Sequence, residues 1–382
     1  MTNNPEWTRE PDLASRRFGG TVMWATDELF AEKENLINAG VPRFLPENFG
    51  PKGQVYDGWE TRRHREPGDD QAIIRLGLAG VISGVLVDTA YFKGNYPPFV
   101  SVEACGVEGY PSGTELIDAP WETLLGRVRV TGDAEHFFDV DSDRRYTHVR
   151  LTMHPDGGVA RLRVHGRPVT DPRLCDLGAL DLAALQNGAA IVDCSDMFYS
   201  SPANMLAPGL AAHQAEGWET ARRRDDGNDW TTLRLAGAGV VRVAELDTSN
   251  LRGNAPGWAA LLGCDATSSD VDDAGAWFTL LPRTRLQPDT RHRFRLAPHA
   301  EVTHVRLDLY PDGGMARLRL HGTLTAAAAE RLVGDWFELL PARQAIEVLL
   351  AEGAEPAAAE RLVASLPLGE LPKVLRELAR PR

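Results

Sequence analysis

The stretch Thr147-His-Val-Arg-Leu-Thr-Met-His-Pro-Asp-Gly-Gly158, which continues through Arg161-Leu-Arg-Val-His-Gly166, occurs twice in this chain. Its second copy extends from Thr303 to Gly322. Each copy alternates polar and apolar residues as a half-buried strand does. Each then reaches Pro-Asp-Gly-Gly, where proline fixes φ and glycine supplies positive φ. The stretch therefore predicts the same β-hairpin at two places in the molecule.

Two motifs ahead of this stretch repeat in the same order. Asp57-Gly-Trp-Glu-Thr-Arg-Arg-His-Arg65 recurs as Glu216-Gly-Trp-Glu-Thr-Ala-Arg-Arg-Arg224. Asp88-Thr-Ala-Tyr-Phe-Lys-Gly-Asn95 recurs at the same offset as Asp247-Thr-Ser-Asn-Leu-Arg-Gly-Asn254. A unit of about 150 residues is too long for a solenoid repeat but long enough for a domain of its own.

The repeat sets the domain organisation. We expect a first domain over residues 1–168, a linker from Pro168 to Asn187, and a second domain over residues 187–325. From residue 326 to 382 the chain changes to alanine-rich segments with leucines at helical spacing, interrupted by glycine and proline. This change predicts a small C-terminal helical extension. Two interpretations of the extension stay open, a packing or oligomerisation element and a functional accessory.

Short β-branched segments separated by turn residues fill each unit, without the helical crossovers of a parallel sheet. The expected strands of the first unit include Ala72–Leu78, Val81–Val87, Val100–Ala104 and His148–Met153. Each unit has room for about eight or more such strands. The pattern predicts an all-β protein of two tandem antiparallel sandwiches of the jelly-roll type.

Charge and hydropathy narrow the classes of partner. The 382 residues are 43% hydrophobic with no long apolar run, so no segment is suited to span a membrane, and the polar start of the chain lacks the apolar core of a secretory signal. The 41 basic and 54 acidic residues give a net charge of −13, which argues against nucleic acid and anionic membranes. We therefore expect a cytoplasmic protein that acts on a small molecule, and a few local arginines can still bind an anionic one.

The four cysteines form no C-x-x-C pair, which argues against a zinc knuckle. Cys105 and Cys264 occupy equivalent positions of the two units, so no disulfide between them is expected. Both are interpreted as small buried residues.

The densest polar cluster of the sequence lies in and just before the Asp-Gly-Trp-Glu motif. Lys52, Arg62 and Arg63 can gather around an anion, since an arginine can grip a carboxylate with two parallel hydrogen bonds. Asp57 and Glu60 lie three residues apart, a spacing that lets one loop offer an acid and a base to the same pocket. The alternative is a structural corner, because an Asp-Gly turn followed by a core aromatic residue is common.

Other polar positions also have open interpretations. Asp27 either ties loops together or helps to hold a structural calcium ion, which takes oxygen ligands. Asn95 belongs to a second polar loop that follows a strand. His148 and His304 alternate with core residues, so each is expected to point away from its own core, where a histidine is more often solvated or paired across strands than catalytic.

The motifs, taken in order, resemble the allantoicase family. The resemblance rests on Ala25-Thr-Asp-Glu-Leu-Phe30, Phe49-Gly-Pro-Lys-Gly53, Tyr56-Asp-Gly-Trp-Glu-Thr-Arg-Arg-His64, Gly94-Asn95 and the duplicated Thr-His-Val-Arg-Leu stretch with its Pro-Asp-Gly-Gly turn. It extends from about Phe18 to Gly322 and leaves the helical extension outside. It implies two galactose-binding-like jelly-roll domains, in agreement with the strand pattern.

The second unit departs from the family pattern. Glu216 stands in place of the family's aspartate, Ala221 replaces the first arginine, and Asn250-Leu251 stands where the family commonly has His-Phe. Because the first unit keeps its Asp-Gly-Trp-Glu motif intact, we expect the active site there.

The resemblance implies hydrolysis of allantoate to ureidoglycolate and urea, in allantoin and purine catabolism. A general acid must protonate the departing urea nitrogen, and a base must deliver water to the carbon left behind. Proton transfer is expected of Asp57 and Glu60. The expected substrate-binding set consists of Lys52, Arg62, Arg63 and Asn95, the last of these on a ureido group.

Metal dependence stays open, because no ligand set has a diagnostic spacing, and a divalent metal ion is the one candidate cofactor. We also expect a homo-oligomer. The alternative from another functional class is a non-enzymatic tandem module that binds carbohydrate or another small ligand on the same sandwich fold. Such modules usually belong to exported proteins and present aromatic platforms, whereas this loop motif is rich in Arg, Glu and Asp.

Overall fold

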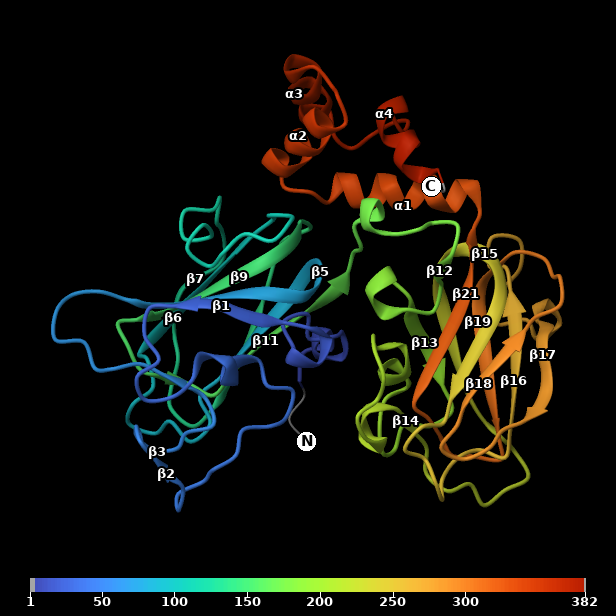
Figure 1. Ribbon diagram of the computed structural model, residues 1–382, viewed down its shortest axis with the longest axis horizontal. Helices are drawn as coiled ribbons and strands as arrows, with labels where there is room; N and C mark the ends of the chain where they lie inside the picture. Colours follow the sequence, from blue (N-terminus) through green and yellow to red (C-terminus); the bar gives the residue numbers. More distant parts are fainter. Residues whose placement is uncertain (1–3, 381–382) are drawn as a thin grey trace. The chain divides into compact units, whose positions relative to one another are not determined.

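The computed structural model of the protein describes residues 4–380 (Figure 1). The chain forms two compact units. One contains the residues through Val169 together with Phe337–Pro367, and the other contains Thr170–Trp336 together with the residues from Leu368 onward. The expected all-β fold with two tandem repeats and a small helical extension is confirmed.

One long strand, β5 (Asp70–Asp88), organises the first unit because its two halves pair with different strands. The other main strands are β1 (Thr21–Ala25), β6 (Phe99–Cys105), β7 (Glu122–Arg129), β8 (Glu135–Asp139), β9 (Arg145–His154) and β11 (Arg161–Pro168). The first half of β5 lies between β1 and β9, and β6 and β7 continue that sheet beyond β9. The second half pairs with β8 and β11. Sharing β5 in this way builds the two faces of the sandwich.

The two strands expected over residues 72–78 and 81–87 are in fact one. The pairing of β5 with β9 shifts register between Arg75 and Gly80, but the strand does not turn there. Glycine weakens a strand locally and allows a bend. The glycines that suggest the end of a strand in the sequence therefore mark the point where β5 changes its pairing partners.

Short strands close one end of the first unit. β4 (Trp59–Glu60) pairs with β10 (Gly158–Val159), and β2 (Phe49–Gly50) forms a small hairpin with β3 (Gly53–Gln54). The Trp59 side chain is fully buried, as expected, and its Nε1 donates to the carbonyl of Asp27 at 2.8 Å. Gly58 precedes it because a Cβ at this position would lie 2.7 Å from the Phe92 ring. The Asp-Gly-Trp motif is thus anchored in the core immediately before Glu60.

The second unit repeats this plan. Its strands are β12 (Leu180–Asp181), β13 (Ala190–Cys194), β14 (Trp218–Glu219), β15 (Asp229–Asp247), β16 (Trp258–Cys264), β17 (Phe278–Arg285), β18 (Arg291–Arg295), β19 (Val302–Tyr310), β20 (Gly314–Met315) and β21 (Arg317–Leu324). β15 has the length and the divided pairing of β5. Trp218 is fully buried, like Trp59.

Core side chains follow the expected alternation, with one informative difference. His148 points away from the core of its sheet but is only 1% exposed, between the cross-strand neighbours Arg75 and Cys105. The loop after β6 closes over this region, and Val107 donates its N–H to Thr147 Oγ1 at 2.9 Å. Burial, assisted by the nearby positive charge of Arg75, lowers the pKa of His148 to about 4. Alternation along a strand cannot reveal what covers the outer face of a sheet.

The helical extension comprises α1 (Ala326–Glu338), α2 (Ala342–Ala351), α3 (Pro356–Ala364) and α4 (Lys373–Arg376). In the first unit, Gln344 of α2 is buried and donates through Nε2 to Glu108 Oε1 at 2.9 Å. Glu108 also forms an ion pair with the buried Arg145, whose backbone N–H donates to Leu339 at 2.6 Å. Helix α2 and the residues just before it are therefore hydrogen-bonded into the first unit.

Over residues 4–380, the protein has no helix that combines the length and the apolar character required to cross a membrane. All four cysteines are free thiols, and Cys105 and Cys264 are buried as expected.

Candidate active site

Glu60 carries a buried carboxyl group, and only one of its two oxygens has a hydrogen-bond partner in the described part of the chain. Its residue is 8% exposed, and its backbone is held on both sides, by Gly158 in β10 and by Ala31 in an isolated bridge. Asn95 Nδ2 donates to Glu60 Oε1 at 2.7 Å. Glu60 Oε2 is buried and has no hydrogen-bond partner among the residues that the structure describes. Burial raises the pKa of this carboxyl, and the hydrogen bond from Asn95 opposes that rise.

In the second unit, both oxygens of the equivalent carboxyl group accept hydrogen bonds. Asn254 Nδ2 donates to Glu219 Oε1 at 2.6 Å, as Asn95 does to Glu60. Gln214 Nε2 donates to the other oxygen, Glu219 Oε2, at 2.6 Å. Only the first unit therefore combines the buried glutamate with an unoccupied carboxyl oxygen.

The carboxylate of Asp57 has hydrogen-bond partners that differ from those of Glu60. Arg161, which is 2% exposed, donates through Nη2 to Asp57 Oδ1 at 2.8 Å. The backbone N–H of Arg43 donates to Asp57 Oδ2 at 2.9 Å, and the guanidinium of Arg161 reaches the carbonyl of Gly40. Both carboxyl oxygens of Asp57 therefore bind partners that hold the long loop before the motif, and Asp57 shares none of these partners with Glu60.

The three basic residues of the predicted substrate-binding set differ in the hydrogen bonds and ion pairs that their side chains already form. Arg62 Nε donates to Asp27 Oδ2 at 2.8 Å, while its side chain remains largely exposed. Lys52 pairs with Glu32 at 2.7 Å. Arg63 is exposed and has no hydrogen bond or ion pair within residues 4–380. Lys52 and Arg62 both contact the segment from Asp27 to Glu32, which includes the residue bridged to Glu60.

Asp27 acts as the loop tie that was one of its two interpretations. Its Oδ1 accepts hydrogen bonds from the backbone N–H groups of Leu29, at 3.1 Å, and Arg62, at 2.7 Å. No group of three or more His, Cys, Asp or Glu side chains that could hold a metal ion occurs in the described part of the chain.

An insertion distinguishes the loops of the two units. Asn35 and Asn204 are equivalent, since each donates to the carbonyl of the glycine before the buried tryptophan. The segment from Asn35 to Asp57 is nearly twice as long as the equivalent segment from Asn204 to Glu216. The additional residues of the first unit include the β2–β3 hairpin and Lys52.

Aromatic side chains from this longer loop remain on the surface beside the Asn95 loop. Phe44 is 54% exposed and stacks on Tyr91, with 5.4 Å between the ring centroids. Tyr91 adopts a positive φ of 68°, as does its counterpart Asn250. The loop geometry is therefore shared between the units, but the aromatic pair belongs to the first alone.

A histidine–carboxylate pair at the same end of the unit was missed by the sequence reasoning. His64 Nε2 lies 3.1 Å from Asp70 Oδ2, and Thr26 Oγ1 donates to the other oxygen of this buried aspartate at 2.7 Å. His64 stands in the Asp-Gly-Trp-Glu motif, but its partner begins β5 and no spacing links the two. In the second unit Arg223 takes the place of the histidine and pairs with Asp229.

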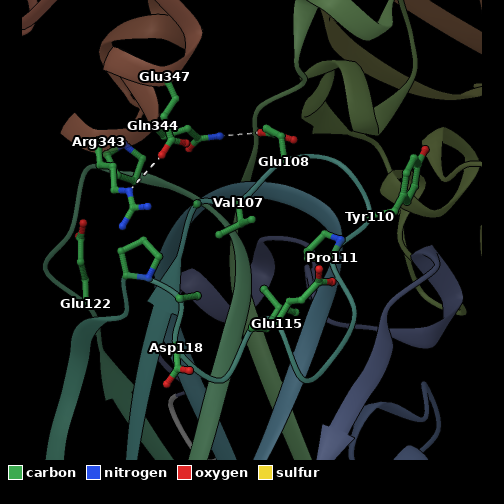
Figure 2. A pocket seen from close by; sticks show the side chains of 15 residues that line it. Val107, Glu108, Tyr110, Pro111, Glu115, Asp118, Glu122, Arg343, Gln344 and Glu347 are labelled. Carbon is green, nitrogen blue, oxygen red and sulfur yellow. Dashed lines mark hydrogen bonds and ion pairs between the residues drawn. The ribbon is translucent and has the colours of Figure 1, made fainter. Parts of the chain in front are cut away.

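A cleft of about 500 Å³ elsewhere in the first unit contains none of the predicted site residues (Figure 2). The loop after β6 and helix α2 line it. Its carboxylates belong to Glu108, Glu115, Asp118, Glu122 and Glu347. Such a surface repels anions, so the cleft does not suit the anionic ligand that the arginines of the motif indicate.

Comparisons with known proteins agree with the repeat. The family model described as "Allantoicase repeat" matches residues 11–169 and again residues 180–325. The chain is 58% identical to a protein of Nocardia farcinica named "Probable allantoicase", over 83% of this chain and 95% of that relative. A "Probable allantoicase" of Streptomyces avermitilis is 48% identical over 87% of this chain and 90% of its own length.

Among solved structures, the crystal structure of allantoicase from Saccharomyces cerevisiae is similar with a TM-score of 0.71 and 34% identity, over 82% of this chain and 93% of that chain. The family model includes both repeats, and the two bacterial relatives align along most of their own length. This chain belongs to the allantoicase family.

Proposed function

We propose that this protein hydrolyses allantoate to ureidoglycolate and urea, and that the reaction takes place at Glu60 in the first repeat. Family membership supports the reaction. The observation that supports the location is the buried Glu60 carboxyl, which has one oxygen held by Asn95 and the other buried without a hydrogen-bond partner in the described chain. The equivalent glutamate of the second repeat has both oxygens occupied.

Allantoate carries a carboxylate and two ureido groups on one carbon. Hydrolysis breaks one carbon–nitrogen bond, places the hydroxyl of water on that carbon, and leaves the second hydrogen of water on the departing urea. Urea leaves readily only when its nitrogen is protonated, so a general acid must act first. Burial raises the pKa of Glu60, so its protonated form persists to a higher pH than that of an exposed carboxyl, as a general acid requires.

The hydrogen bond from Asn95 fixes which oxygen carries the proton. Glu60 Oε1 accepts from Asn95, so the proton of the neutral acid resides on the open Oε2. After Oε2 protonates the departing urea, Glu60 is a carboxylate and can remove a proton from the attacking water. One carboxyl group thus serves as acid and then as base. Proton transfer by Asp57 stays a prediction, with its oxygens bonded to Arg161 and Arg43.

The substrate carboxylate is proposed to bind the arginines of the motif. Arg63 is exposed without a partner in the described chain, and the terminal nitrogens of Arg62 are uncommitted there because only its Nε bonds Asp27. A guanidinium binds a carboxylate through two parallel hydrogen bonds. Lys52 would have to exchange Glu32 for the substrate. Asn95 keeps its amide oxygen available for a ureido N–H.

Urea release from allantoate by the purified full-length chain tests the proposal. Three conditions are compared: no addition, a chelator, and added divalent metal. We expect release that requires Glu60, and the chelator arm decides the metal question. Absence of release in all three conditions would overturn the proposed reaction and favour the alternative of a ligand-binding module.

The proposal includes a homo-oligomer and a cytoplasmic location. The four free thiols fit a reducing compartment. Light scattering on the purified chain, and fractionation of cells that produce it, test these two parts separately.

A further inference from the structure

A serine, a histidine and an aspartate form a continuous hydrogen-bonded chain on the first repeat, outside the Glu60 site. Ser101 Oγ lies 3.0 Å from His154 Nε2. His154 Nδ1 lies 2.8 Å from Asp69 Oδ2. Ser101 belongs to β6, His154 ends β9, and Asp69 immediately precedes β5. The proposed hydrolysis of allantoate uses none of the three.

The three side chains lie on the outer face of their sheet. The neighbours of Ser101 in β6, Val100 and Val102, are fully buried in the core, so the serine points to the opposite face. Met153 places His154 on that face in the same way. Ser101 is partly exposed, and the side chains of His154 and Asp69 are 12% and 45% exposed, so the network is reached by solvent mainly from the side of the aspartate.

Hydrogen-bond chemistry fixes the polarity of the network. An ionised carboxylate can only accept, so His154 Nδ1 must carry the proton that it shares with Asp69. In a neutral imidazole Nε2 is then unprotonated and accepts from the Ser101 hydroxyl. This is the tautomer in which a histidine can remove a serine proton, with an aspartate that holds the ring in place.

The strand beside Ser101 is irregular at the point where it passes the serine. Val100 lies opposite Val128 and Val102 opposite Leu125, so the two residues Gly126 and Arg127 oppose Ser101 alone. Such a bulge leaves the extra residue out of the regular ladder of hydrogen bonds. Around Gly126 no atom lies within 4 Å of the position of a Cβ, which leaves space for a ligand.

Positive charge is also close to this face. The Arg127 guanidinium lies 4.8 Å from the centroid of the Phe99 ring, and Phe99 is two residues before Ser101 on the same side of β6. A cation and an unpaired backbone segment are the kinds of group that stabilise negative charge on an oxygen during acyl transfer.

The second repeat lacks the whole network. Ala260 stands in place of Ser101, Tyr310 in place of His154 and Asn228 in place of Asp69. Because both repeats build the same strands, the fold itself does not require the three polar groups.

We propose that Ser101, His154 and Asp69 form a nucleophilic serine site that acts on activated carboxylic esters. Ser101 Oγ bonds to the carbonyl carbon while its proton passes to His154 Nε2. The bond from that carbon to the alcohol or phenol oxygen breaks, and this oxygen takes the proton. Water repeats the sequence, which releases the acid and restores the serine. Asp69 is 45% exposed in its side chain, so the histidine is only weakly supported and good leaving groups are favoured.

Covalent labelling of the full-length chain with a fluorophosphonate probe is the decisive experiment. The serine oxygen bonds to phosphorus, fluoride leaves, and the proton departs through His154. Peptide mass spectrometry then locates the label. We expect label at Ser101, its loss in Ser101→Ala, and labelling at least about tenfold slower in His154→Gln and Asp69→Asn. Hydrolysis of p-nitrophenyl acetate should fall in the same order.

Two controls separate chemistry from folding. Ser112→Ala removes a serine outside the network and should label as the parent chain does. Urea release from allantoate should be unchanged in all four variants, because none of them alters the Glu60 site. The proposal is overturned if Ser101 carries no label, or if its labelling rate does not depend on His154, while urea release shows that the variants are folded.

Discussion

Glu60 and Glu219 occupy the same position in two copies of one motif and differ in a single hydrogen bond. An asparagine holds one oxygen of each, but Gln214 occupies the second oxygen of Glu219 only. A carboxyl that must release and recover a proton needs one oxygen free. At this carboxyl the two repeats therefore differ in whether its second oxygen has a partner.

Substitution of the two glutamates tests this difference. Glu60→Gln keeps the size and one acceptor but cannot transfer a proton, so kcat should fall by about 10²–10⁴-fold. Glu219→Gln should have a much smaller effect. Steady-state urea release gives both values, with circular dichroism to verify folding. Equal and small effects would mean that both glutamates are structural, and a larger loss at Glu219 would move the active site.

The pH profile should respond to Asn95. Burial raises the pKa of Glu60 and the hydrogen bond from Asn95 lowers it, because that bond stabilises the charged form. The active form is the protonated acid, so kcat should decrease as pH rises through the folded-state pKa. In Asn95→Ala the lowering contribution is lost, and the alkaline limb should move to higher pH. A limb that stays in place or moves to lower pH would contradict the assigned role.

Substitution of each arginine should distinguish a role in substrate binding from a role in local stability. Arg63→Ala removes only an exposed anchoring group and should raise KM with little change in kcat. Arg62→Ala also releases Asp27, so it should raise KM and lower the melting temperature. Arg65→Ala, at an exposed position just beyond the motif, is the control. Initial rates over a range of allantoate concentrations provide the comparison, and an unchanged KM in both variants would exclude the clamp.

At this scale the sequence motifs singled out two residues that the structure brings together. Glu60 and Asn95, both singled out from their motifs, are in direct contact. The partner of Asp57 could not be predicted, because Arg161 is distant along the chain and only the folded sandwich brings them together. The pairing of His64 with Asp70 was missed for a related reason, since no motif joins the two residues.

At the scale of elements, helix α2 behaves as a component of the first unit rather than as an appendage. The buried Gln344 and Arg145 both contact the partly exposed Glu108, and this network links α2 to β9. Helical periodicity predicted the helix, but nothing in the periodicity indicates which surface it covers. The division of β5 between two sets of partners escaped prediction in a similar way, because pairing partners are not encoded in the strand itself.

The network makes a prediction about stability. Gln344→Ala removes a hydrogen bond to a charged group and should lower the free energy of unfolding by about 1–3 kcal/mol. Deletion of the residues beyond Leu324 should lower it further, while the active site of the chains that remain folded is retained. Denaturant unfolding and urea release, measured together, test both changes. A truncated chain that is fully folded but inactive would assign the extension to the chemistry.

At the scale of the whole molecule, we predict one allantoate site per chain, although the fold is repeated. Calorimetric titration of the Glu60→Gln chain with allantoate should give about one ligand per chain, since only the first repeat combines the longer loop with the intact arginine pair. Arg63→Ala in that background should weaken binding without a change in stoichiometry. Two equivalent sites would show that the second repeat also binds. The duplication itself was evident in the sequence, because its motifs recur at nearly constant offsets.

The hydrogen bond from Gln214 to Glu219 has a consequence for how such a chain can evolve. The second repeat has kept its glutamate and asparagine, so it retains two of the residues that the proposed active site uses. Gln214→Ala would uncover the carboxyl, and Ala221→Arg would restore the missing half of the clamp. Urea release by a Glu60→Gln chain that carries both changes would show whether these two substitutions are sufficient to make the second repeat catalytically active.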